Sequence, residues 1–176
     1  MEDIEKFRSF SCPRWEALPE IELYMDQVLT LVSKHFGIFM SADGMTASMI
    51  NNYVKASVVP SPKKKRYGKE HISRIFIICV LKRVLSISQI GVLLELLQSD
   101  MDAEALYTLF CEKLDRSVRY ISTILSGAEG SYPVESDKTG AELALQCAVD
   151  AFSNCVLADV VLGSTPKREE VPEEKQ

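Results

Sequence analysis

Apolar residues recur at helical spacing along most of this chain. Residues 72–81 are apolar nearly all round, which is typical of a helix buried at the centre of a core. Residues 102–126 instead carry a single apolar stripe, made of Leu106, Phe110, Leu114, Val118, Ile121 and Leu125. The pattern predicts helices at 21–36, about 46–56, about 69–85, 87–98, about 102–126 and 140–162.

The predicted helix at 46–56 is short and has two different faces. Thr46 is a suitable N-cap, because its hydroxyl can accept a hydrogen bond from the first helical turn. The face expected to point inward carries Met49, Ile50, Tyr53 and Val54. The opposite face carries hydroxyl, amide and ammonium groups, from Ser48, Asn51, Asn52 and Lys55.

A small hairpin is predicted to follow this helix. Val58-Val59-Pro60-Ser61-Pro62 cannot extend the helix, because proline lacks an N–H and holds the chain extended. Two β-branched residues, a proline-containing turn and then Lys65-Arg66-Tyr67 are typical of two short strands. We therefore expect a basic wing at about 58–67, in a two-stranded hairpin at about 57–67 that is the only β structure.

Short motifs mark where the later helices begin. Ser86 and Gln89 form a capping box, and Leu85 and Ile90 occupy the positions of a hydrophobic staple. Ser99-Asp100 and Thr139-x-x-Glu142 are the caps expected for the last two helices.

The predicted helices and the breaks between them suggest three regions. Prolines 13 and 19 flank Trp15, so residues 1–20 are expected to form an extended strap on the core. This strap and the following helices make up a unit of residues 1–100. Residues 101–163 either form a dimer interface or complete the core of one chain. Residues 164–176 are polar and charged, and are predicted to be a disordered tail.

Positive charge is concentrated in one window of an acidic chain. The whole chain carries a net charge of −5 at pH 7. Residues 46–83 contain nine Lys or Arg and one acidic residue, Glu70, so this window carries +8 and the remainder −13. Such a separation of charge favours one face that meets an anion while the rest of the surface keeps the protein soluble.

The composition argues against several classes of protein. The longest purely apolar run, residues 75–81, is far shorter than the roughly 20 residues that cross a bilayer. The first ten residues lack the apolar core of a secretory signal, so we expect a cytoplasmic protein without a membrane partner. The cysteines show no C-x-x-C spacing, and no metal site is predicted. No nucleophile–base spacing or Gly-rich phosphate loop is present, so we expect neither an enzyme nor a cofactor.

The order of these elements, together with five short motifs, resembles the DNA-binding domain of MerR-type transcriptional regulators. The similarity spans residues 46–97, and the longer chain, including CPRWEALPEIELYMDQV, also resembles an uncharacterised bacterial family of small MerR-like proteins. The matching residues are Thr46, Ile50 and Tyr53 in the recognition helix, Val58-Val59-Pro60 at its exit, Lys65-Arg66-Tyr67 in the wing, Glu70-His71-Ile72 in the next helix, and Leu85 to Ile90 beyond it.

The resemblance implies a MerR-like winged helix-turn-helix with a short β-wing. Beyond residue 100, MerR relatives have one long dimer helix, whereas this sequence predicts a C-terminal helical hairpin, so the expected fold is mainly α. The resemblance also implies a transcriptional regulator that binds double-stranded DNA as a homodimer, with no effector indicated. Tyr67 could reach a phosphate through its hydroxyl or pack under the wing. The residues predicted to contact DNA are Ser48, Asn51, Asn52, Lys55, Lys63, Lys64, Lys65, Arg66, Tyr67 and Lys69.

A second interpretation keeps the same fold without transcriptional regulation. In it, the protein is a non-enzymatic adaptor whose basic wing binds an acidic protein or RNA. Salt-sensitive and sequence-selective binding to DNA would distinguish the regulator from the adaptor.

Overall fold

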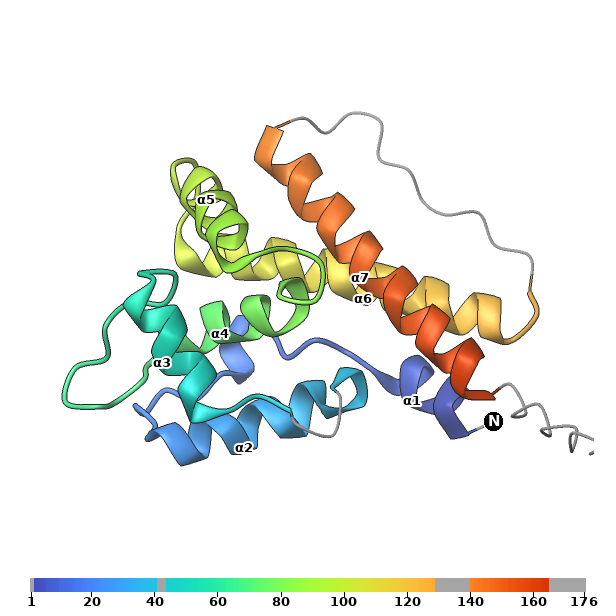
Figure 1. Cartoon of the computed structure of the whole chain (residues 1–176), viewed down its shortest axis with the longest axis horizontal. Helices are drawn as coiled ribbons and strands as arrows, with labels where there is room; N and C mark the ends of the chain where they lie inside the picture. The colour runs from blue at the N-terminus through green and yellow to red at the C-terminus, as the bar shows by residue number, and fades with distance from the viewer. Residues whose placement is uncertain (1, 41–43, 129–139, 165–176) are drawn as a thin grey trace, which may run out of the picture.

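The computed structural model of this chain describes residues 2–40, 44–128 and 140–164 (Figure 1). These residues are mainly helical, as predicted. The helices are α1 (Glu2–Ser9), α2 (Met25–Phe36), α3 (Ala47–Lys55), α4 (Lys69–Leu81), α5 (Ile87–Gln98), α6 (Ala103–Leu125) and α7 (Gly140–Ser164), with the short 3₁₀ turns η1 (Trp15–Ala17) and η2 (Gly37–Phe39).

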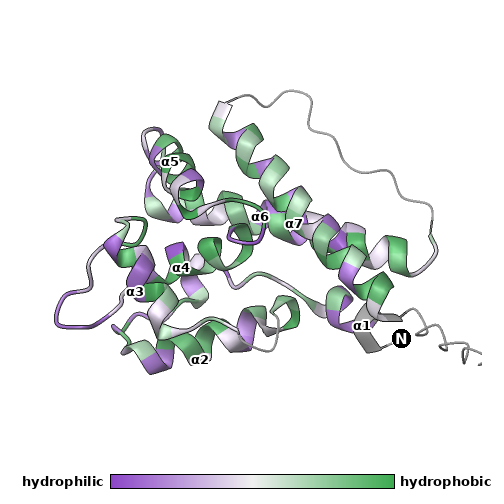
Figure 2. Ribbon diagram, in the orientation of Figure 1, coloured by the Kyte–Doolittle hydropathy of each residue, from purple (hydrophilic) through white to green (hydrophobic). Residues whose placement is uncertain are grey.

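Helix α4 lies at the centre of the molecule, as its all-round apolar sequence predicts. Every residue from Ile75 to Leu81 is buried, and α2, α6 and α7 pack around this helix (Figures 1 and 2). The Phe76 ring lies 4.8 Å from the Phe36 ring of α2, measured between centroids. The core therefore holds α2, and with it the start of α3, against the rest of the chain.

The predicted β-wing is wrong. Residues 57–67 all belong to the described part of the chain, and none of them lies in a β-strand. Pro60 and Pro62 have no N–H to donate, so the first arm of the expected hairpin cannot build a ladder. The second arm pairs elsewhere, because the amide of Tyr67 donates to the carbonyl of Leu23 and that of Leu23 to the carbonyl of Tyr67, each at 2.9 Å. We call residues 60–67 the basic loop.

The extended strap predicted for residues 1–20 is only partly correct. Residues Glu2–Ser9 form helix α1, which packs against α6. Both prolines that argued against a helix, Pro13 and Pro19, lie beyond its end. The chain is non-helical from residue 10 to residue 14 and then forms the single turn Trp15–Ala17.

A buried carboxylate fastens this N-terminal segment to α6. Asp115 accepts a hydrogen bond from the amide of Cys12 at 2.7 Å. It also forms an ion pair with Arg14 at 2.6 Å. Next to it, the hydroxyl of Tyr107 donates to the carbonyl of Pro13 at 2.8 Å. These bonds satisfy backbone groups that would otherwise be buried without partners.

The capping box predicted for α5 is confirmed, whereas the cap predicted for α6 is wrong. The Ser86 amide donates to Oε1 of Gln89 at 2.9 Å, and the Gln89 amide donates back to Oγ of Ser86 at 3.3 Å. Helix α6, however, is capped by Asp102, whose Oδ1 accepts from the amide of Ala105 at 2.8 Å, and not by Ser99-Asp100. The predicted cap Thr139 and the predicted tail from residue 165 onward lie outside the described residues.

The apolar stripe of α6 is used within one chain. Leu106, Phe110, Leu114, Val118 and Ile121 are all buried, and α1, α4 and α7 pack against this helix. From the sequence, residues 101–163 are expected either to form a dimer interface or to complete the core of one chain. The stripe of α6 is buried within one chain, so it completes the core.

Helix α7 crosses α6 and closes the core (Figure 1). Its inner face buries Leu145, Val149, Phe152 and Val156. By length and composition alone, Gly140–Gly163 is the one helix among the described residues that could span a membrane. The core helix of a soluble protein meets the same two criteria, and 39% of the apolar window of this helix is buried inside the molecule.

Candidate nucleic-acid interface

Helix α3 presents the polar face that its sequence predicts. The hydroxyl of Thr46 accepts from the amide of Met49 at 3.2 Å and so caps the helix. Ile50 and Tyr53 are buried, which fixes the rotation of the helix about its axis. The outer face is therefore exposed along the whole helix, through Ser48, Asn51, Asn52 and Lys55.

The end of α3 is closed by a Schellman motif. The amide of Val58 donates to the carbonyl of Tyr53 at 3.0 Å, and that of Ser57 to the carbonyl of Val54 at 3.0 Å. Ser57 adopts a left-handed conformation with φ of 59°, a position that glycine usually occupies. This motif turns the chain sharply, so that Val58 and Val59 are buried and the basic loop starts beside α3.

The tip of the basic loop is a tight turn built from lysines. The carbonyl of Lys63 accepts from the amide of Arg66 at 2.9 Å. Between them, Lys64 and Lys65 have φ values of 50° and 60°, so both central residues are left-handed, as in a type I′ turn. Asn-Gly is the usual pair in such a turn, because β-carbons make this conformation unfavourable. The turn therefore holds two adjacent cations at a conformational cost.

Arg66 is anchored on an aromatic side chain that the sequence pattern did not single out. Its Nη2 donates to the hydroxyl of Tyr24 at 3.0 Å, and its guanidinium carbon lies 4.9 Å from the centroid of the Tyr24 ring. Tyr24 lies within the predicted helix 21–36, but α2 begins only at Met25, and the side chain of Tyr24 at its N-cap is exposed.

Two of the predicted contact residues are engaged within the protein. Tyr67 is only 3% exposed and its ring packs edge-on against His71, so it packs beneath the loop as one of the two alternatives proposed. Lys69 forms an ion pair with Glu20 and lies 5.7 Å from the centroid of the Trp15 ring.

The Lys and Arg residues of the positive window 46–83 do not all lie on one surface of the structure. Arg74 is half-buried and braces the start of the basic loop, donating to the carbonyl of Val58 at 3.0 Å and to the side chain of Gln98. Burial in this position lowers the pKa of Arg74. Lys82 and Arg83 lie at the far end of α4, beside a separate cavity. The cations exposed on α3 and the basic loop are Lys55, Lys63, Lys64, Lys65 and Arg66.

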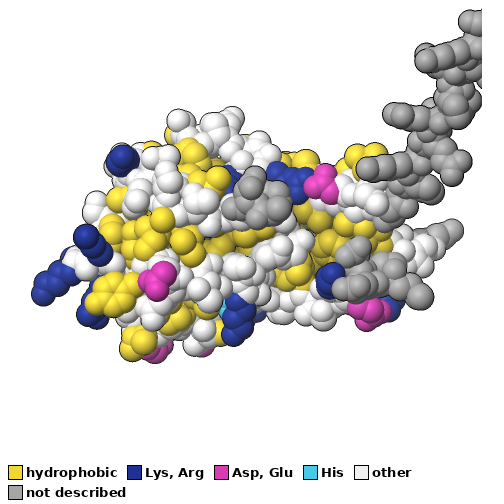
Figure 3. Space-filling view, turned by 60° about the horizontal axis from the view of Figure 1, so that its bottom comes forward, with side chains coloured by type: hydrophobic (Ala, Val, Ile, Leu, Met, Phe, Trp, Pro, Cys, Tyr) yellow, Lys and Arg dark blue, Asp and Glu magenta, His cyan; other side chains and the backbone are white. Residues whose placement is uncertain are grey.

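These five cations are exposed on α3 and the adjoining basic loop, at the end of the molecule that also carries the polar face of α3. Figure 3 shows Lys and Arg side chains projecting from the end of the molecule where α3 and the basic loop lie in Figure 1. None of them forms an ion pair with a carboxylate of the described residues. An arrangement of solvated cations beside amide and hydroxyl groups can bind a polyanion and contact polar groups next to it.

No metal chemistry is indicated in the part of the chain that the structure describes. There, no group of three or more His, Cys, Asp or Glu residues is placed to hold an ion.

The chain belongs to the family described as Domain of unknown function (DUF1836), which matches residues 13–110 and thus more than half of the sequence. The matched region contains α2 to α5, including α3 and the basic loop. No curated protein and no solved structure matches the chain.

Proposed function

We propose that this protein binds double-stranded DNA through α3 and the basic loop, and that it regulates transcription. The observation that carries this proposal is the turn at Lys64 and Lys65. Two adjacent lysines occupy left-handed positions at the tip of a loop, without carboxylate partners among the described residues. Backbone strain of this kind persists where the strained residues serve a purpose, and here it presents two ammonium groups beside a polar helix.

The chemistry of DNA suits this surface in two ways. Ammonium and guanidinium groups neutralise phosphates and release counterions, which favours binding to any sequence. The exposed amides of Asn51 and Asn52 have the donor and acceptor pair that reads the N6 and N7 edge of adenine in the major groove. The resemblance of residues 46–97 to the DNA-binding region of MerR-type regulators supports the same assignment.

The competing adaptor function differs in its ligand. We expect the purified protein to shift duplex DNA from the region upstream of its own gene, with an affinity that falls steeply with salt. Fluorescence anisotropy with this duplex, a scrambled duplex, an RNA hairpin and polyglutamate measures the preference. Equal binding to both duplexes, or stronger binding to RNA or polyglutamate, would favour the adaptor instead.

Asn51 is expected to contribute to sequence selectivity rather than to general affinity. Replacing it with alanine should weaken binding to the cognate duplex by about 1–3 kcal/mol, because a bidentate contact to one base is lost. Binding to a scrambled duplex should not change, since phosphate contacts remain. The matched control is Asn154→Ala, which removes an exposed amide from α7. An equal loss on both duplexes would contradict a reading role for Asn51.

A regulator of this kind usually binds two half-sites as a dimer, and the exposed apolar face of α5 offers a contact surface. Val92 is 57% exposed and Leu96 is 54% exposed, one turn apart on this helix. We propose that two copies meet through this face, because the exposed pair Val92 and Leu96 can pack against the same pair of a second copy about a two-fold axis.

The dimer is tested by placing a charge on this face. Leu96→Glu should raise the dimer dissociation constant by about 100-fold, because a two-fold interface loses two buried leucines at about 1.5 kcal/mol each. Sedimentation equilibrium measures the constant, with Leu162→Glu as a control at another exposed leucine. A wild-type protein that stays monomeric at about 100 μM would end the proposal, since stable dimers form well below this.

A further inference from the structure

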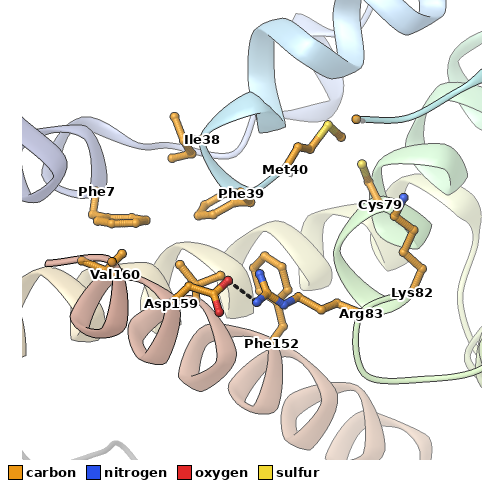
Figure 4. A pocket seen from close by; sticks show the side chains of 13 residues that line it. Phe7, Ile38, Phe39, Met40, Cys79, Lys82, Arg83, Phe152, Asp159 and Val160 are labelled. Carbon is orange, nitrogen blue, oxygen red and sulfur yellow. Dashed lines mark hydrogen bonds and ion pairs between the residues drawn. The ribbon is translucent and has the colours of Figure 1, made fainter. Parts of the chain in front are cut away.

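A cavity of about 750 Å³ lies away from the basic loop, between α1, η2, the end of α4 and α7 (Figure 4). Its volume is within the range of about 300–1,000 Å³ that is usual for small-molecule sites. Seven of the thirteen residues that line it have apolar side chains, from α1, η2 with the adjoining Met40, and α7, namely Phe7, Ile38, Phe39, Met40, Phe152, Val156 and Val160.

Three of the apolar residues in this wall are aromatic and lie close together. The centroids of Phe7 and Phe39 are 6.2 Å apart, and those of Phe39 and Phe152 are 5.3 Å apart. Phe7 and Phe152 are buried members of the core, so they hold the ring of Phe39 in place but expose little surface themselves. A hydrocarbon or aromatic body would lie against the partly exposed Phe39 and Met40 and the exposed Ile38.

The polar groups of the cavity have an excess of positive charge. Arg83 forms an ion pair with Asp159, which neutralises one cation and one anion (Figure 4). Lys82 has no carboxylate partner among the described residues, and its ammonium group contacts the sulfur of Met49 at 3.7 Å. Burial raises the pKa of the Cys79 thiol to about 12, so this group adds no negative charge at neutral pH.

We propose that this cavity binds an amphipathic organic anion. The apolar body of the ligand lies against Ile38, Phe39 and Met40, and its carboxylate pairs with the ammonium group of Lys82. An apolar wall with one unneutralised cation selects an acid over the corresponding alcohol or amine, because only the acid supplies the missing charge.

The cavity also adjoins the elements that position α3. Met40 and Gly44, in the segment between α2 and α3, line it, and Lys82 contacts Met49 on α3 itself. A carboxylate bound to Lys82 competes with the contact between Lys82 and Met49 and lies beside Met40 and Gly44. The coupling to DNA rests on the proposed DNA-binding function. With that function, the ligand changes the affinity for DNA, and DNA changes the affinity for the ligand by the same factor.

Ligand binding is tested without DNA, by isothermal titration calorimetry of the full chain. The probes are decanoate, decan-1-ol and decyltrimethylammonium, which share one tail and differ in charge. Decanoate should bind about 10-fold more tightly than the alcohol, as expected for one charge-assisted contact. The cation should bind most weakly. Equal affinities, or no binding of decanoate, would overturn the proposal.

Variants then locate the charge. Lys82→Gln should lower the affinity for decanoate about 10-fold and leave that for decan-1-ol unchanged. The control Lys34→Gln removes an exposed lysine of α2 that does not line the cavity, and should change neither affinity. Ile38→Glu places a carboxylate on the exposed edge of the cavity and should also weaken decanoate binding. Circular dichroism confirms that each variant is folded, and unchanged decanoate binding by both cavity variants would place the ligand elsewhere.

The two functions fail separately in these experiments. Calorimetric binding of decanoate by a protein that does not bind DNA would support the cavity and refute the regulator. DNA binding by a protein that does not bind decanoate would support the regulator and refute the ligand proposed for the cavity. Lys55→Gln, which alters the proposed DNA surface, should weaken DNA binding and leave decanoate binding intact.

Discussion

Replacing Lys64-Lys65 with Asn-Gly is expected to raise the free energy of unfolding by about 1–2 kcal/mol and to weaken DNA binding at the same time. Stability increases because asparagine and glycine adopt left-handed conformations with little strain, whereas both lysines now hold φ values near 50–60°. Urea denaturation followed by circular dichroism measures the first effect.

The loss of DNA binding should depend on salt. If Lys63, Lys64, Lys65 and Arg66 neutralise about four phosphates per chain, the logarithm of the binding constant falls with that of the salt concentration at a slope of about −3.6. Removing two contacts should halve the slope, which makes binding about 30-fold weaker at ~0.15 M salt. The loss should be the same for every sequence, because phosphates carry no sequence information.

A second variant separates charge from strain. Lys64→Ala/Lys65→Ala removes the same two charges but keeps a β-carbon at each left-handed position. It should weaken DNA binding as much as the Asn-Gly variant without the gain in stability. Wild-type affinity of both variants at low and high salt would mean that the basic loop serves another partner.

Asp115→Ala is expected to lower the free energy of unfolding by about 3 kcal/mol, the largest effect that we predict for a polar residue. The carboxylate is buried and holds both the amide of Cys12 and the guanidinium of Arg14. Without it, the buried amide has no acceptor, and the segment that joins α1 to η1 keeps the bond from Tyr107 to Pro13 but loses two of its bonds to α6.

The matched control is a carboxylate in an exposed ion pair. Asp159 pairs with Arg83 on the surface, so Asp159→Ala should cost at most about 1 kcal/mol. Urea denaturation of both variants gives the comparison. Similar losses for the two would show that the Asp115 bonds contribute no more than a surface pair. Hydrogen exchange at the Cys12 amide should be faster in Asp115→Ala, which locates the defect.

Features set by neighbouring residues could be predicted from the sequence alone. The cap at Thr46, the capping box of Ser86 and Gln89 and the exposed face of α3 all depend on groups within one helical turn. The burial of α4 also follows from its composition, because a helix that is apolar all round has no face to leave in water. The sequence therefore predicts correctly that the polar face of α3 is exposed.

The remaining features depend on contacts between residues far apart in the sequence. Tyr67 pairs with Leu23 instead of the opposite arm of a wing, and Lys69 pairs with Glu20. The stripe of α6 is covered by α1, α4 and α7, and the cavity collects side chains from the first helix and the last. Periodicity shows which face of an element is apolar, but not which partner covers it. Only tertiary packing makes that choice, because burial and hydrogen bonding reward any partner that fits.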